Sequence, residues 1–173
     1  MPLCVNERVP AATLRYLEGE AQRSVCTDSL LAGRKVVMFS CVGAFGPGGG
    51  EALTLSYRTH RDALRALGVD SIVCVLVNDP YVVEAWRQHL ALGDDLHLLS
   101  DAHCEHHHAV GLHFDGSSQA LGWRPRPYSM LVDDGTVRLL NVAEPGAEHE
   151  CAADILIQQI RARREHAPVE IPS

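Results

Sequence analysis

The fold is decided by residues 33–77, which read GRKVVMFSCVGAFGPGGGEALTLSYRTHRDALRALGVDSIVCVLV. Residues 35–42 and 71–77 are apolar runs of strand length, a pattern typical of central strands buried on both faces. Between them, a glycine-rich loop at 43–50 leads into residues 51–68, where apolar side chains recur at helical spacing up to a terminal glycine. The order of strand, helix and strand predicts a βαβ unit with a right-handed crossover.

The chain on both sides of this unit predicts further short elements. An Asp-Gly pair between two apolar runs indicates a hairpin, and an Asn-Asp-Pro sequence is typical of the start of a helix. The predicted elements are a helix that begins at 78–80, a strand at 96–99, a helix at 102–111, hairpin strands at 128–132 and 137–142, and a last helix at 151–164. No internal repeat or linker divides the sequence, so residues 1–173 are expected to form a single domain.

Composition and charge narrow the possible functions. The chain has 173 residues, of which 46% are hydrophobic, and a formal net charge of −7. That charge disfavours DNA and RNA as partners, because nucleic-acid binding depends on cationic contacts to phosphates. No apolar run reaches the roughly 18 residues of a membrane span, and the start does not resemble a signal peptide. We therefore expect a cytoplasmic protein whose six scattered cysteines are mostly free thiols.

Five short motifs, taken together, carry a resemblance to a known family. They are Gly33-Arg34-Lys35-Val36-Val37-Met38-Phe39, Gly43-Ala44-Phe45 with Pro47, Val77-Asn78-Asp79, Leu98-Leu99-Ser100-Asp101, and Tyr128-Ser129-Met130 followed by Asp134-Gly135. In this order they resemble the peroxiredoxin-5 subfamily, from about residue 4 to residue 160. The resemblance implies an α/β domain of the thioredoxin-like (peroxiredoxin) fold, with a central mixed sheet flanked by helices, and a homodimer.

The same resemblance implies that the family's catalytic residues are missing. In that family a cysteine at a helix N-terminus is held as a thiolate by the helix dipole, free N–H groups and an arginine. The family's proline, threonine and peroxidatic cysteine fall at Val42, Gly46 and Gly49, and its arginine falls at Pro127. Arg126 is one position away, and a shift of one residue along a strand turns a side chain to the other face. Ordinary thiol peroxidase chemistry is therefore not expected.

The remaining cysteines offer few substitutes for the missing thiol. Cys41 and Cys74 belong to predicted strands, where we expect small core residues whose pKa values are raised by burial. Cys151 lies near the place of a resolving cysteine in some family members, but it has no function without a peroxidatic partner. A residual peroxidase that uses Cys41 or Cys104 stays an alternative hypothesis.

The glycine loop itself indicates a second kind of site. It leads into a helix whose first N–H groups could bind an anion or a developing oxyanion. Loss of two side chains would enlarge the pocket there, which we expect to be lined by Phe45, Gly46, Gly49, Gly50 and Tyr128. Glu51 is a candidate acid or base, although an acidic residue in the first helical turn is also favourable in its own right.

Histidines are concentrated in one segment. Ten are present, and six of them lie between residues 97 and 113. On a helix over 102–111, His103, Cys104, His107 and His108 would share one face and form two pairs spaced four residues apart, while His106 would lie on the opposite, core face. Imidazole and thiolate ligands at this spacing suit Zn, Cu, Ni or Fe, so one interpretation of these residues is a metal site. The alternative is that they form an ordinary solvated surface.

These features together predict a peroxiredoxin-like protein used for something other than thiol peroxidation. Our leading hypothesis is a metal-dependent enzyme that uses the histidine segment and the glycine pocket on a small-molecule substrate. The alternatives are a non-catalytic module that binds a small ligand or a protein, and the residual peroxidase.

Overall fold

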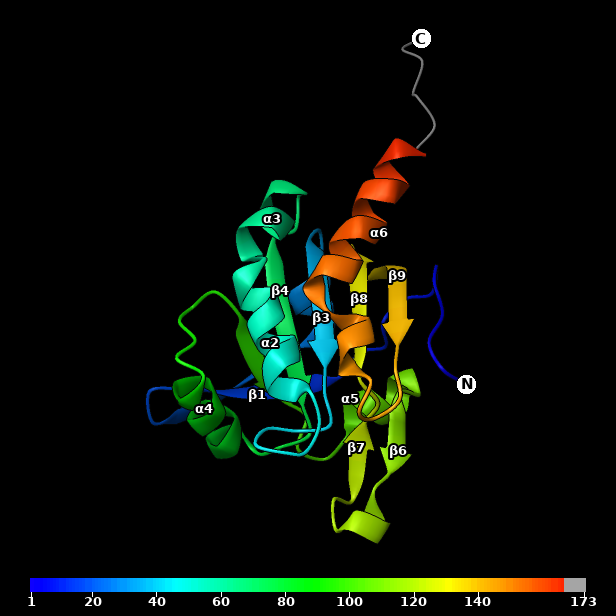
Figure 1. Ribbon diagram of the computed structural model, residues 1–173. Helices are drawn as coiled ribbons and strands as arrows, with labels where there is room; N and C mark the ends of the chain where they lie inside the picture. Colours follow the sequence, from blue (N-terminus) through cyan, green and yellow to red (C-terminus); the bar gives the residue numbers. More distant parts are fainter. Residues whose placement is uncertain (167–173) are drawn as a thin grey trace.

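Seven strands form one mixed sheet at the centre of the computed structural model, which describes residues 1–166 (Figure 1). The strands are β1 (Thr13–Glu18), β2 (Ala21–Cys26), β3 (Lys35–Ser40), β4 (Ser71–Leu76), β5 (His97–Ser100), β8 (Tyr128–Asp133) and β9 (Thr136–Val142). Their order across the sheet is β2-β1-β5-β4-β3-β8-β9. The parallel strands β3, β4 and β5 are central, and antiparallel strands complete both sides. The predicted central mixed sheet is therefore present.

The predicted βαβ unit is confirmed, with one difference in its helix. Strands β3 and β4 are parallel, with Phe39 opposite Cys74, and the hairpin of β8 and β9 turns at Asp134 and Gly135. The single helix expected over residues 51–68 is two helices, α2 (Gly50–Thr59) and α3 (Arg61–Ala66). At the break, His60 has a φ of −99° and a ψ of 11°, and both its backbone N–H, at 3.0 Å, and its ring Nδ1, at 2.9 Å, contact the Ser56 carbonyl.

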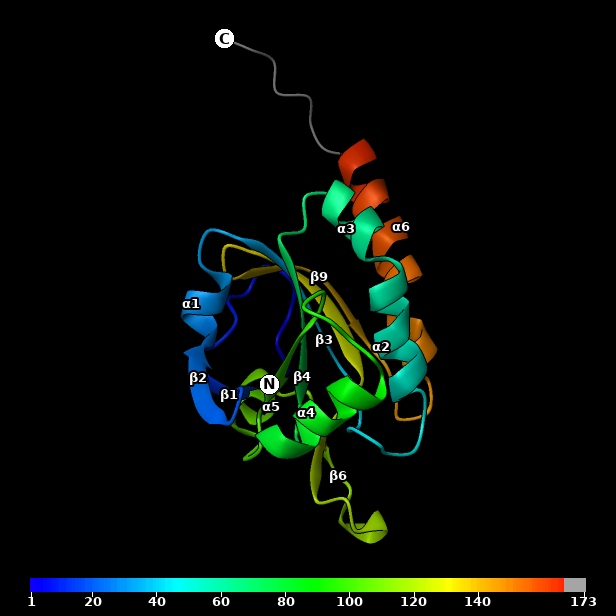
Figure 2. The same cartoon turned by 90° about the vertical axis from the view of Figure 1, so that its left-hand side faces the viewer.

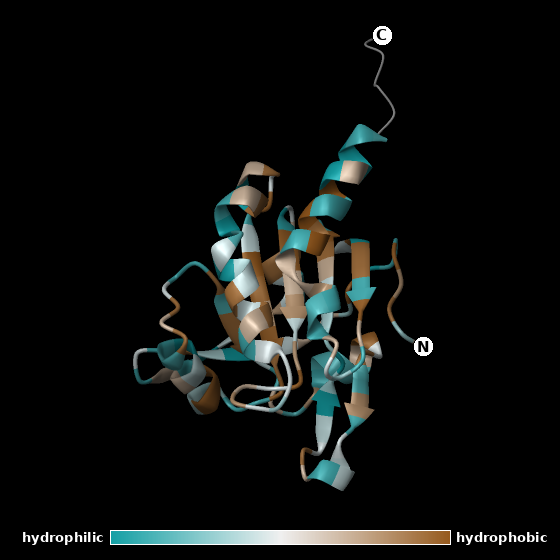
Figure 3. Ribbon diagram, in the orientation of Figure 1, coloured by the Kyte–Doolittle hydropathy of each residue, from teal (hydrophilic) through white to brown (hydrophobic). Residues whose placement is uncertain are grey.

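Helices cover both faces of the sheet (Figure 2). Helices α2, α3 and α6 (Ala153–Glu165) lie together on one face, and α1 (Thr27–Leu31) with the N-terminal segment lies on the other. The central strands are largely hydrophobic, whereas the C-terminal turns of α6 are mostly hydrophilic (Figure 3). Helix α4 (Pro80–His89) begins as predicted, because the Asp79 carboxylate accepts the N–H groups of Tyr81 and Val82, each at 2.9 Å. Among residues 1–166, no helix has the length and apolar character that a bilayer crossing requires.

The histidine segment folds differently from the sequence prediction. Helix α5 spans only Glu105–Val110, not residues 102–111, because Cys104 adopts a left-handed conformation with φ of 58°. His103 and Cys104 therefore precede the helix, and the predicted common face of four residues is wrong. A second, two-stranded sheet of β6 (His113–Asp115) and β7 (Trp123–Pro125), which the sequence did not predict, extends from the end of α5.

Candidate functional site

The glycine loop lies between β3 and the first turn of α2, as predicted. What the sequence missed is Glu148, which lies in the 3-10 helix Glu148–Cys151 and is only 1% exposed. A Cβ atom at Gly48 would come within 2.7 Å of Glu148 Oε1, and one at Gly49 within 3.2 Å of its Cβ. The prediction of open space at Gly49 is therefore wrong, because the Glu148 side chain fills that space.

The Glu148 carboxylate is only partly hydrogen bonded. Its Oε1 accepts the Gly146 N–H at 3.2 Å, and its Oε2 has no hydrogen-bond partner among the residues that the structure describes. A buried carboxylate beside the first turn of a helix is stabilised by the helix dipole and by the free N–H groups there. The chain itself therefore places a carboxyl group where we expected an external anion.

The other residues expected at this pocket are dispersed. The Phe45 ring is exposed and packs against His89, with ring centres 5.4 Å apart. Glu51 is also exposed, and its Oε2 is 4.0 Å from His89 Nε2, so it faces solvent from the first turn of α2. Tyr128 is fully buried and directs its hydroxyl towards two histidines. A polar site lined by Glu51 and Tyr128 is thus not formed.

The cation at the loop comes from Arg124 in β7, not from Arg126. The Arg124 guanidinium donates to the Val42 carbonyl at 3.2 Å and lies so close to Gly43 that a Cβ atom there would clash with it. Arg126 instead pairs with the exposed Glu144 at 2.8 Å. The period of two along a strand predicted that Arg126 would face away from the loop. The contact of Arg124 with the loop could not be predicted, because it depends on the second sheet, which the sequence did not indicate.

The buried thiols are all protonated at neutral pH. Burial raises the pKa of Cys41 to about 12, that of Cys151 to about 12 and that of Cys104 to about 11, and it raises the pKa of Cys74 well above its ordinary value. Cys41 and Cys74 are fully buried, as expected of small core residues. None of these four thiols is a ready nucleophile, because the thiolate is the reactive form.

A second polar site lies at the end of β5, where Asp101, Cys104 and His107 form what we call the Asp101 cluster. One ligand atom from each lies within 4.8 Å of the others, and all three residues are buried. The sequence predicted Cys104 and His107 as ligands, but it assigned Asp101 only to a helix cap. His103 and His108, the other predicted ligands, are exposed and lie outside the cluster.

Hydrogen bonds to Asp101 hold the cluster together. Its Oδ1 accepts the His106 N–H at 3.1 Å, and its Oδ2 accepts the His107 N–H at 3.1 Å. The His107 ring is 2.8 Å from the same Oδ2 through Nδ1. Burial lowers the pKa of His107, so the ring is neutral and donates its Nδ1 proton to the carboxylate. The other ring nitrogen, Nε2, therefore carries a lone pair.

Two further buried groups extend this arrangement. The Tyr128 hydroxyl is 3.2 Å from His107 Nε2 and 3.5 Å from His106 Nε2. Burial raises the pKa of Tyr128 well above its ordinary value, so the hydroxyl stays protonated and can donate. His106 Nδ1 has no hydrogen-bond partner among residues 1–166. His106 was predicted to face the core, and it is fully buried.

The Asp101 cluster is not completely closed. Asp101, with Arg15, His103 and Glu105, lines a small surface cavity of about 70 Å³. That volume admits water-sized groups beside the carboxylate. Three protein donors and an adjoining small cavity are the arrangement that a metal ion with one open coordination position needs.

The central mixed sheet, with helices on both faces and a loop that opens onto α2, defines a thioredoxin-like domain of the peroxiredoxin type. Residues 4–156 match the Redoxin family, and the chain belongs to that family. The family resemblance and the fold class inferred from the sequence motifs are thereby confirmed.

Relatives and solved structures agree with this assignment. The chain is 39% identical to peroxiredoxin-2E-2, chloroplastic, of Oryza sativa subsp. japonica, over 91% of this chain and 72% of that protein. It is 31% identical to peroxiredoxin-2B of Arabidopsis thaliana, over 92% of this chain and 99% of the relative. The crystal structure of reduced Prx3 from Vibrio vulnificus in complex with H2O2 has a TM-score of 0.87 at 32% identity, over 95% of this chain and 99% of that one.

Proposed function

We propose that this redoxin-family chain is a metal-dependent enzyme whose metal ion is bound by Asp101, Cys104 and His107. The observation that carries the proposal is the Asp101 cluster itself, in which carboxylate, thiol and imidazole ligand atoms lie within 4.8 Å of one another in a buried setting. This ligand set differs from the one expected from sequence, because Asp101 replaces His103 and His108.

The donor chemistry fits a transition metal better than Mg or Ca. Thiolate and imidazole ligands favour Zn, Cu, Ni or Fe, whereas hard cations prefer oxygen ligands alone. Cys104 would release its proton on binding, as thiol ligands do even where burial raises the pKa. An ion of this class would supply a Lewis acid for a small substrate. Asp101 would be reached from the cavity that it lines with Arg15 and His103.

The backbone at Cys104 supports a functional reason for the thiol. A φ of 58° is unfavourable for a residue with a side chain, and strained backbone positions cluster at functional sites. From this conformation, the Cys104 thiol lies within 4.8 Å of a ligand atom of Asp101 and of His107.

Metal analysis of untagged protein tests the proposal. The protein is equilibrated with Zn, Cu, Ni or Fe, desalted and measured for retained metal. We expect near-stoichiometric metal that is lost in Cys104→Ala and in His107→Ala but kept in His103→Ala, which removes an exposed histidine of the same segment. Lack of retained metal, or equal loss in the His103 variant, contradicts the proposal.

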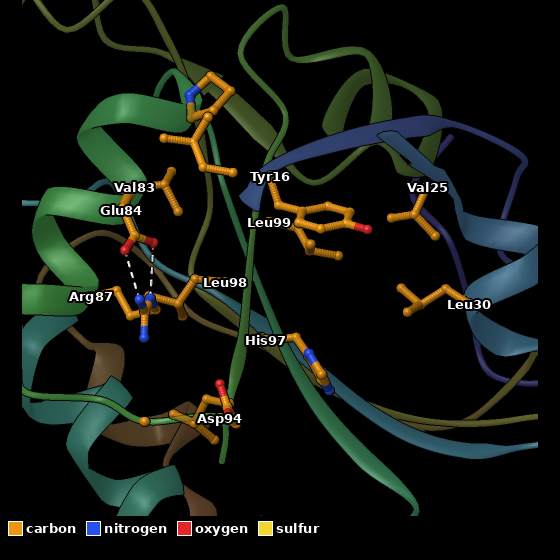
Figure 4. A pocket seen from close by; sticks show the side chains of 14 residues that line it. Tyr16, Val25, Leu30, Val83, Glu84, Arg87, Asp94, His97, Leu98 and Leu99 are labelled. Carbon is orange, nitrogen blue, oxygen red and sulfur yellow. Dashed lines mark hydrogen bonds and ion pairs between the residues drawn. The ribbon is translucent and has the colours of Figure 1, made fainter. Parts of the chain in front are cut away.

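A second candidate function is the binding of a small ligand without turnover. A cavity of about 470 Å³ lies between α4 and the β1, β2 and α1 unit (Figure 4). Leucine and valine side chains line much of this cavity, and Tyr16 and His97 add polar groups. Arg87 and Glu84 also line it and form an ion pair at 2.6 Å. Ligand pockets typically combine apolar walls with a few polar groups in this way. Thermal unfolding with candidate ligands distinguishes this function, since a binder gains stability without any product.

A residual thiol peroxidase is the third candidate, and peroxide consumption tests it directly. Consumption that disappears in Cys41→Ala or Cys104→Ala would support it. The raised pKa values of both thiols disfavour it.

Several wider properties are also proposals. The net charge of −7 disfavours nucleic acid as a partner, and a small molecule is the substrate or ligand that we propose. The family resemblance favours a homodimer, which light scattering after size-exclusion chromatography would test. We propose the cytoplasm as its compartment, although the relatives include proteins named chloroplastic and mitochondrial, and fluorescence microscopy of the tagged chain would test this.

A further inference from the structure

A second group of histidines lies on the surface beside α5, outside the Asp101 cluster. It consists of His108 on α5, His113 at the start of β6, and Trp123 on β7. The ring centres of the two histidines are 4.2 Å apart. The Trp123 ring centre lies 5.2 Å from that of His108 and 5.3 Å from that of His113.

Backbone carbonyls fix the orientation of both imidazoles. His108 Nδ1 is 2.6 Å from the Cys104 carbonyl, and His113 Nδ1 is 3.1 Å from the His107 carbonyl. A carbonyl oxygen can only accept a hydrogen bond, so Nδ1 carries the proton in each ring. In the neutral rings, both Nε2 atoms therefore carry lone pairs. They also point away from the α5 backbone, because Nε2 and Nδ1 lie on different sides of the ring.

This tautomer, with Nδ1 bonded to a carbonyl and Nε2 free, is the one that histidine metal ligands use. A ligating histidine usually donates its other N–H to a carbonyl or carboxylate, which fixes the tautomer and the direction of the lone pair. Neither Nε2 has a hydrogen-bond partner within residues 1–166. His108 and Trp123 are exposed and His113 is partly exposed, so an ion has access from solvent.

We infer that His108 and His113 form a surface site for a divalent transition metal, with Ni, Cu or Zn as the ion and water at the remaining positions. Imidazole suits these ions, and copper has the highest affinity for such ligands in the first transition row. The site is separate from the Asp101 cluster, because its ligands are different side chains. Either site can therefore be absent while the other one binds.

Trp123 makes the site measurable with a bound probe. A paramagnetic ion such as Ni²⁺ quenches indole fluorescence at short range, whereas Zn²⁺ does not. Trp86, the second tryptophan, is buried on α4 and serves as an internal reference. Ni²⁺ is preferred to Cu²⁺ as the probe, because Cu²⁺ oxidises thiols and Cys4 is exposed.

The experiment is a titration of the full chain with NiCl₂, followed by tryptophan fluorescence. We expect saturable quenching that excess Zn²⁺ reverses. His108→Ala and His113→Ala each remove one of the two ligands, so each should weaken the apparent affinity at least about ten-fold, the loss that even an outer-shell change typically causes. Trp123→Phe should abolish the quenching while equilibrium dialysis still detects bound nickel.

Two controls separate this site from its surroundings. His103→Ala removes an exposed histidine of the same segment, and Cys104→Ser removes a ligand of the Asp101 cluster but keeps the carbonyl that His108 contacts. Both should leave the quenching unchanged. If circular dichroism shows that the alanine variants are unfolded, His108→Gln and His113→Gln replace them. Glutamine keeps an N–H donor but has no imidazole. Quenching that survives when His108 and His113 are both replaced in one chain, or that falls equally in His103→Ala, overturns the inference.

Discussion

At the scale of single residues, Gly49 and Glu148 depend on each other. Gly49 has a φ of −91°, which other residues also adopt, so only the nearby Glu148 side chain restricts this position. We expect Gly49→Cys to lower the free energy of unfolding by about 1–3 kcal/mol, the usual cost of overpacking. The same substitution in a Glu148→Gly background should cost much less, because both the carboxylate and the Cβ that lies 3.2 Å from the added Gly49 Cβ are then absent.

A double-mutant cycle by urea denaturation measures this coupling. Equal costs of Gly49→Cys in both backgrounds would show that Glu148 does not occupy the space. Peroxide consumption by the double variant can be followed in the same samples, because that variant would restore a thiol at the first turn of α2 without a neighbouring carboxylate.

His106 is the residue from which we expect pH-dependent stability. Burial, followed by the effect of His107, lowers the pKa of His106 from 6.5 to about 3. Below pH 6.5 the unfolded chain takes up a proton that the folded chain does not, so stability falls as the pH is lowered. This one group contributes a slope of at most about 1.4 kcal/mol per pH unit.

Urea unfolding at several pH values between 7 and 5 tests this expectation. The lowered pKa of His107 acts in the same direction, whereas Asp101 titrates below this range. His106→Phe should flatten the slope, and His103→Ala, at an exposed position, should not. An unchanged slope in His106→Phe would show that the ring is not the source.

At the scale of elements, the left-handed conformation of Cys104 at the start of α5 lowers the stability of the fold. A side chain in the left-handed conformation is unfavourable by roughly 1–2 kcal/mol relative to glycine. We therefore expect Cys104→Gly to be more stable than Cys104→Ala by about 1 kcal/mol, although both variants lack the thiol. Chemical denaturation of metal-free protein compares the two. Equal stabilities would mean that the turn is not strained.

The elements also show which features could be predicted from sequence. Residues 33–77 and the hairpin at Asp134 and Gly135 have strong local patterns, so β3, β4, β8 and β9 were predicted correctly. The start of α5 was not, because helical periodicity carries no signal for the left-handed turn at Cys104. Glu148 was missed for a different reason. Its role depends on a long-range contact with Gly48 and Gly49, which no local pattern encodes.

At the scale of the whole molecule, the N-terminal segment joins α5 to the far edge of the sheet. The Leu3 N–H donates to the Val110 carbonyl at 2.8 Å, and the Asn6 N–H donates to the Val137 carbonyl at 2.8 Å. A Cβ atom at Gly111 would lie 2.8 Å from Pro2 Cα, so the segment crosses directly over the end of α5. Leu3 is buried beside Val110 in the core on this face of the sheet.

We therefore expect Leu3→Ala to lower the free energy of unfolding by about 2–5 kcal/mol, the range for a buried leucine, and to loosen α5 in particular. Val5→Ala, at an exposed position two residues further on, should cost less than about 0.5 kcal/mol. Hydrogen exchange of the α5 amides should accelerate in the Leu3 variant and not in the Val5 variant. Because α5 carries His107, metal retention should fall together with this protection. Normal retention in a variant whose α5 amides exchange rapidly would show that the metal ligands are held independently of the N-terminal segment.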